Sequence, residues 1–98
     1  MIRHIALFTW KDGTTAEQIA EVTRRLEGLG ATVPGIRAFA CGPDVGGADG
    51  HWDYAVNADF DDLDAYRVYA THPDHLAVIA ESIVPHRADR AVLQIEIA

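Results

Sequence analysis

The sequence is poor in several features that mark particular classes of protein. Basic residues are scarce: 8 Lys and Arg stand against 15 Asp and Glu, and the formal net charge is -7. Such a surface repels the phosphates of nucleic acids and anionic membranes, so we expect neither as a partner. The single cysteine, Cys41, has no second thiol for an internal disulfide, which is typical of a reducing cytoplasm.

Long apolar runs are also absent. A membrane-spanning helix needs about 20 consecutive apolar residues, and no such run occurs. The apolar stretch at residues 1–10 is too short for a signal peptide, so we expect a cytoplasmic protein. Repeats and linkers are missing too, and 98 residues suit one domain spanning residues 1–98.

The apolar residues that are present, 49% of the chain, follow strand and helix periodicities. Residues 3–10 alternate like a strand, with His4, Ala6, Phe8 and Trp10 on one face and Ile5, Leu7 and Thr9 on the other. Both faces of this strand are largely apolar, so we expect both to be covered. Residues 36–41, 52–60 and 91–97 are predicted to form the other strands.

Helix signals fill the intervals between the predicted strands. Thr14 and Glu17 match a capping box, and a stripe from Ile19 to Leu29 predicts a helix that stops at Gly30. Asp61 is the expected N-cap of a second, short helix. Pro73 suits the first turn of a helix better than its interior, so a further helix is predicted from Pro73 to about Glu81.

The order strand, helix, strand, strand, helix, strand predicts an α+β fold of the ferredoxin-like split βαβ type. Its four-stranded antiparallel sheet would carry helices on one face only. The other face, with Ile5 and Leu7, then needs a cover. The simplest cover is the same sheet of a second copy, so we predict a homodimer formed by sheet-on-sheet packing.

The segment from Tyr69 to His75 concentrates groups that can transfer protons. Tyr69, His72 and His75 recur at spacings of three, and residues three apart share a face of a helix, although Pro73 distorts that path. A histidine can act as acid or base near neutral pH, and a phenol can donate to a developing oxyanion. By spacing alone, the plainer interpretation stays open: a capping His72, a surface His75, and a core histidine at His4.

Two other kinds of site are weaker candidates. His72, Asp74 and His75, with His51 or His86, could supply metal ligands, but the spacing of two histidines alone is poor evidence, and we expect no metal. The glycine-rich loop at residues 41–50 lacks the Lys-Ser/Thr ending of a phosphate loop and leads into a strand, so we interpret it as a hairpin connection.

With these residues placed, the chain resembles the stress-responsive dimeric α/β-barrel family, known as Dabb. The most specific match is Tyr69-x-x-His72-Pro73-x-His75. The likeness also covers the strand that carries His4, the Val33-Pro34-Gly35-Ile36 entry into the second strand, and the strand at residues 54–60. It therefore extends over nearly the whole length.

The resemblance implies a barrel of two chains with a pocket between sheet and helices in each. The family's best-understood activity is that of a plant polyketide cyclase, which closes a ring by aldol condensation without a cofactor. By this resemblance Tyr69 and His75 would be catalytic. The implied substrate-binding residues are His4, Ala6, Phe8, Val22, Leu26, Val56, His72 and Ile79. Val22, Thr23 and Leu26 replace bulky aromatics of the plant enzyme.

The leading hypothesis is thus a cofactor-independent, cyclase-like lyase or isomerase acting on a small carbonyl compound of polyketide type. An alternative from another class is a non-catalytic, stress-responsive dimer that binds a small apolar ligand. A third hypothesis is a cofactor-free monooxygenase, because related dimeric barrels include such enzymes.

Overall fold

The computed structural model describes residues 1–98 and contains four strands and three helical segments, the last of which ends in a π-helical turn. Their bounds are β1 Ile2–Trp10, α1 Ala16–Thr32, β2 Ala38–Pro43, β3 Tyr54–Phe60, α2 Leu63–Thr71, α3 Pro73–Val78, the π-helical turn η1 Ile79–Ile83, and β4 Arg87–Glu96. None of the helices is long and apolar enough to cross a membrane.

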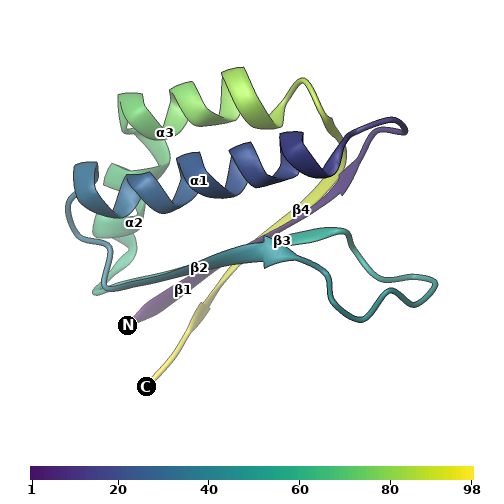
Figure 1. The fold of residues 1–98 in the computed structure, drawn as a ribbon. Helices are drawn as coiled ribbons and strands as arrows, with labels where there is room; N and C mark the ends of the chain where they lie inside the picture. Colours follow the sequence, from purple (N-terminus) through teal and green to yellow (C-terminus); the bar gives the residue numbers. More distant parts are fainter.

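The strands form one antiparallel sheet in the order β2-β3-β1-β4, and the helices pack on one of its faces (Figure 1). The predicted ferredoxin-like fold is therefore confirmed. The N- and C-terminal strands are hydrogen-bonded neighbours, so the two ends of the chain lie near each other.

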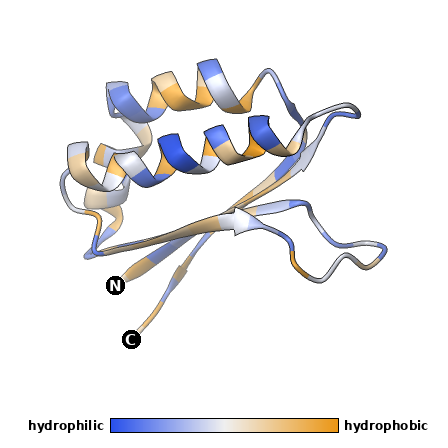
Figure 2. Cartoon of the chain, in the orientation of Figure 1, coloured by the Kyte–Doolittle hydropathy of each residue, from blue (hydrophilic) through white to orange (hydrophobic).

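Side-chain alternation along β1 divides the sheet into a helix-covered face and an open face. His4, Ala6 and Phe8 are buried beneath the helices, together with Val56, Ala58 and Phe60 of β3. Ile5 and Leu7 point the other way, as predicted, and pair with Leu93 and Ala91 of β4. Leu93 is 49% exposed, so the open face carries apolar surface that this single chain does not cover. Figure 2 shows hydrophobic segments along the sheet as well as on the helices.

Helix α1 begins one residue later than predicted. Thr15, and not Thr14, is the N-cap: its hydroxyl accepts from the Gln18 amide, and the Gln18 side chain accepts from the Thr15 amide. The Thr14 hydroxyl instead donates to the Lys11 carbonyl in the preceding turn. Gly30 does not stop the helix, which continues to Thr32, because Leu29 and Val33 keep it packed on the core.

The predicted ends of other elements also shift, and β3 begins at Tyr54 and not at residue 52. The N-cap of α2 is Asp62, whose carboxylate accepts from the Ala65 amide; Asp61 instead pairs with Arg37. Strand β2 starts at Ala38 and not at residue 36. Strand β4 starts at Arg87, four residues before the prediction, because its ladder with β1 continues past a register shift as far as Trp10.

We predict that replacing Thr15 with Ala lowers the free energy of unfolding by about 1 kcal/mol, because the Gln18 amide at the start of α1 loses the Thr15 hydroxyl as its acceptor. Thr14→Ala removes one hydrogen bond in an exposed turn and is the matched control, with a smaller loss. Urea denaturation of both variants measures the difference. Equal losses, or a larger loss for Thr14→Ala, would show that the cap is misassigned.

Candidate functional site

A cavity of about 260 Å³ lies between the sheet and the segment that runs from α2 through η1. Its 15 lining residues are His4, Ala6, Phe8, Leu26, Val56, Tyr66, Tyr69, Ala70, His75, Leu76, Ile79, Ile83, Arg87, Arg90 and Val92. They come from three strands and every helical segment. This volume is slightly below the usual range for small-molecule sites, so the cavity suits a small ligand.

The interruption between α2 and α3, at His72 and Pro73, positions the Tyr69 and His75 side chains in the cavity. Pro73 has no amide hydrogen, and the His72 amide donates to the Tyr69 carbonyl instead, ending α2. His72 is extended, and its Nδ1 accepts from the Asp74 amide at 3.1 Å, so it caps α3. The change of direction brings the His75 ring against the Tyr69 ring, with centroids 4.2 Å apart.

The same break selects the protonated nitrogen of His75. Because the Asp74 amide donates to His72, the Ala70 carbonyl is not used by the amide four residues later. That carbonyl lies 3.2 Å from His75 Nδ1. A carbonyl only accepts, so His75 Nδ1 carries the hydrogen and Nε2 keeps a free lone pair.

His4 is the second imidazole of the cavity and is held by the edge strand β4. Its Nδ1 lies 2.8 Å from Gln94 Oε1, and the two residues are directly paired in the β1–β4 ladder. Its ring is 4.9 Å from that of Tyr66 and 5.9 Å from that of Tyr69. His4 therefore completes an aromatic cluster around the cavity, as a histidine with a hydrogen-bond partner.

Burial controls the protonation of these groups. Desolvation lowers the pKa of His75, and the hydrogen bond to the Ala70 carbonyl offsets only part of that shift. Desolvation also lowers the pKa of His4. Burial raises the pKa of the Tyr69 hydroxyl, which therefore stays protonated at neutral pH. The cavity thus contains neutral imidazoles and a neutral phenol.

The Tyr69 hydroxyl is available to a ligand. It makes no hydrogen bond within the chain, although Tyr69 is only 1% exposed. It is also not sealed off, because the one fully buried side-chain polar atom without a partner is Nε1 of Trp10. A hydroxyl with these properties can donate to an oxygen that enters the cavity.

The structure brings most of the residues implied by the family resemblance to this cavity. Tyr69, His75, His4, Ala6, Phe8, Leu26, Val56 and Ile79 line it. Val22 and His72 do not. Val22 lies on the buried face of α1, and the His72 side chain caps α3, so neither lines this cavity; their contact with a substrate stays a prediction.

Sequence reasoning missed seven lining residues: Tyr66, Ala70, Leu76, Ile83, Arg87, Arg90 and Val92. The spacing of three between Tyr66 and Tyr69 was a usable signal, because such residues share a helix face. Ile83 is brought in by η1, where the Val84 amide donates to the Ile79 carbonyl five residues back. The arginines were missed because β4 was predicted to start after them.

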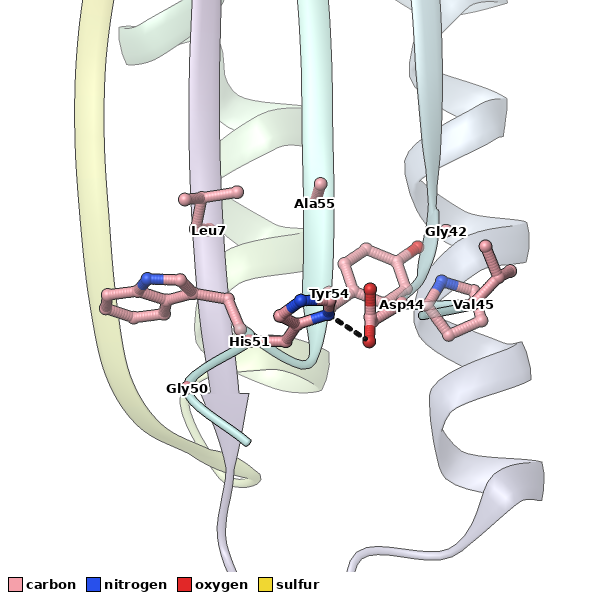
Figure 3. A pocket seen from close by; sticks show the side chains of 10 residues that line it. Leu7, Gly42, Asp44, Val45, Gly50, His51, Tyr54 and Ala55 are labelled. Atoms are coloured by element: carbon pink, nitrogen blue, oxygen red, sulfur yellow. Dashed lines mark hydrogen bonds and ion pairs between the residues drawn. The ribbon is translucent and has the colours of Figure 1, made fainter. Parts of the chain in front are cut away.

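A second hollow lies outside the helix-covered layer, where the β2–β3 loop meets the open sheet face. Figure 3 shows Leu7 and Ala55 on this face, with the His51 imidazole beside the Asp44 carboxylate at 3.3 Å. The hollow is larger, at about 510 Å³, but shallow and open, and it contains neither Tyr69 nor His75. The enclosed cavity is therefore the better candidate site.

Metal coordination finds no support in the side-chain geometry. No three His, Cys, Asp or Glu side chains lie close enough together to hold a metal ion. The chemistry of the cavity is that of imidazole, phenol and guanidinium groups.

A four-stranded antiparallel sheet with helices on one face defines the ferredoxin-like class of α+β proteins. Within that class, residues 2–97 match the stress-responsive A/B barrel domain, Dabb, and the chain belongs to this family.

Two solved structures and one curated relative illustrate the range of the family and the fold. A dimeric ferredoxin-like protein of unknown function from Thermobifida fusca is 45% identical, with a TM-score of 0.89, over 98% of this chain and 90% of that chain. The stress-response A/B barrel protein HS1 of Arabidopsis thaliana is 29% identical over 76% of this chain and 71% of its own length. A hydroxynitrile lyase from Passiflora edulis shares the fold at 22% identity and a TM-score of 0.84, covering 99% and 93%.

We predict that the stability of the protein falls as the pH drops from about 7 to 5. The folded pKa values of His4 and His75 lie below the ordinary 6.5, so the unfolded chain binds more protons in this window. Stability is therefore complete above the ordinary pKa and is lost as the pH falls through the folded values. Urea denaturation across this range measures the slope.

The controls are His75→Asn and His4→Asn, each of which should reduce the slope. Titration of the imidazole resonances by NMR gives the pKa of each ring directly. A His75 pKa at or above 6.5 would contradict the prediction.

Proposed function

We propose that the protein is a cofactor-independent, cyclase-like lyase or isomerase that acts on a small carbonyl compound of polyketide type. One observation carries this proposal: an imidazole with a free Nε2 packs against an unpaired phenol inside a small enclosed cavity. The Dabb fold is also that of a hydroxynitrile lyase, so it is compatible with lyase chemistry.

His75 is the proposed general base. Its lowered pKa keeps the ring neutral at physiological pH, and its Nδ1 bond to the Ala70 carbonyl orients Nε2. The proton on a carbon between two carbonyls is already fairly acidic, so a modest, well-placed base is sufficient. Nε2 takes that proton, and the resulting enolate carbon attacks a second carbonyl of the same substrate molecule.

Tyr69 is the proposed partner of the developing oxyanion. Burial keeps its hydroxyl protonated, and no group of the chain competes for that hydrogen. Its hydrogen bond to the enolate or aldol oxygen is stronger in the transition state than in the ground state. Protonated His75 then returns the proton to the aldol oxygen, so the base is regenerated without a cofactor.

A non-catalytic ligand-binding protein is the second candidate. It is favoured by the lining itself, since 11 of the 15 residues are hydrophobic and would hold an apolar molecule without turnover. Turnover of a carbonyl substrate separates the two, because a binding protein retains the ligand unchanged.

We also propose that the protein forms a homodimer through the open face of the sheet. Leu93 and Ile95 project from that face and are 49% and 40% exposed, beside Ile5 and Leu7 of the next strand. The relative from Thermobifida fusca is dimeric. Packing two such faces removes this apolar surface from water.

The catalytic proposal is tested by cyclisation of a linear triketide or tetraketide. His75→Asn should lower the rate about 100-fold or more, because general-base catalysis contributes 10²–10⁴-fold. Tyr69→Phe should also lower it, with the lining shape preserved. The matched control is His51→Asn, which removes an imidazole from the β2–β3 loop, outside the cavity.

The control should keep nearly full activity. Unchanged rates and products in both His75→Asn and Tyr69→Phe would exclude this mechanism, and unaltered binding of an apolar ligand would then favour the non-catalytic candidate.

The dimer is tested by placing a charge on the open face. Leu93→Asp should convert a dimer to a monomer in sedimentation experiments, because the carboxylate would be buried without a partner. Val68→Asp is the matched control: Val68 is 48% exposed on α2, in the helical layer, and its variant should stay dimeric. A wild-type monomer, or an unaffected Leu93→Asp dimer, would contradict the proposed interface.

A further inference from the structure

The arginines of this acidic chain divide into two groups by their partners. Five of the seven form ion pairs with carboxylates: Arg3–Asp59, Arg24–Glu21, Arg25–Glu81, Arg37–Asp61 and Arg67–Asp64. Arg87 and Arg90 have neither an ion pair nor a side-chain hydrogen bond. Both of these unpaired residues line the enclosed cavity.

The cavity is thus a positive site in a protein whose net charge is -7. None of its 15 lining residues is an Asp or a Glu. Desolvation lowers the pKa values of His4 and His75, so both rings are neutral at physiological pH. The two guanidinium groups are then the only formal charges of the lining, and no carboxylate of the chain neutralises them.

Strand β4 places these charges on the side of the cavity that opens to solvent. Arg90 is paired with Phe8 and Val92 with Ala6, so both occupy the helix-covered face of the edge strand. Val92 is nevertheless 40% exposed, whereas Tyr69 at the other side is 1% exposed. Arg87 lies on the same strand, paired with Trp10 beyond the register shift. The charges therefore stand at the mouth and the tyrosine-histidine pair inside.

We propose that the ligand of this cavity is an oxo acid, whose carboxylate is bound by Arg87 and Arg90 and whose carbonyl points toward Tyr69 and His75. A guanidinium group can donate two parallel hydrogen bonds to a carboxylate. A bound anion would therefore supply the ion-pair partner that Arg87 and Arg90 lack within the protein. The small volume favours a carboxylate over a bulkier anion. The placement of the carbonyl rests on the proposed function, while the binding of the anion does not.

The proposal is tested with two probes of almost equal shape, para-acetylbenzoate and para-acetylbenzamide, which differ in charge. Calorimetric titration at low ionic strength should give at least about tenfold tighter binding of the benzoate. The double variant Arg87→Gln/Arg90→Gln should lose this preference and keep its affinity for the benzamide. Arg87→Lys/Arg90→Lys, which retains the charge, should keep part of the preference.

The matched control is Arg24→Gln/Arg67→Gln. It removes the same charge from exposed, ion-paired arginines of α1 and α2, and it should bind the benzoate like the wild type. Equal binding of the two probes by the wild type would overturn the proposal. An equal loss of benzoate preference in the control would also overturn it, because the preference would then follow from net charge. Tighter binding of para-acetylphenyl phosphate than of the benzoate would overturn it as well.

This experiment is independent of turnover. His75→Asn should abolish cyclisation and leave the preference for the benzoate intact. A wild-type protein that prefers the benzoate but shows no turnover would reject the proposed function alone, whereas a wild-type protein that turns over its substrate without any preference would reject the anion site alone.

Discussion

The arrangement of the cavity depends on one interruption of the chain, at His72 and Pro73. A continuous helix from Leu63 to Ile83 would place Tyr69 and His75 six residues apart along one axis, on different faces. The interruption turns α3 against α2 and brings the two rings into tilted contact. Its cost in backbone hydrogen bonds is offset locally, because the His72 side chain accepts one freed amide and its own amide reaches the Tyr69 carbonyl.

The sheet imposes a second constraint that reaches the same cavity. Period-two alternation sends His4, Ala6 and Phe8 under the helices and Ile5 and Leu7 to the open face. A slip of one residue in the β1 register would exchange these sets and remove His4 from the aromatic cluster. The same register places the apolar residues Ile5 and Leu7 on the open face. One alternation along β1 therefore determines both the apolar surface of that face and the position of His4 in the cavity.

The fold and half of the site were predictable from sequence because they depend on local patterns. Alternation located β1 and β3, and the family resemblance of the Tyr69-to-His75 motif pointed to two side chains that meet in the cavity. What failed were features decided by competition between equivalent neighbours. Thr14 and Thr15 can both act as an N-cap, and so can Asp61 and Asp62. Thr14 donates instead to the Lys11 carbonyl, and Asp61 pairs with Arg37, so Thr15 and Asp62 are the residues that cap the helices. No local pattern contains that information.

Strand β4 illustrates a deeper limit of sequence reasoning. Residues 87–90 contain two arginines and an aspartate, and such a stretch has no apolar alternation to mark a strand. They become a strand because β1 offers its free edge as far as Trp10. Backbone pairing therefore positions Arg87 and Arg90 at the cavity, where their guanidinium groups have no ion pair and no side-chain hydrogen bond. A strand ordered by its backbone can present charged groups that a hydrophobically ordered strand would exclude, so the edge of the sheet is the part of this fold best suited to set ligand charge.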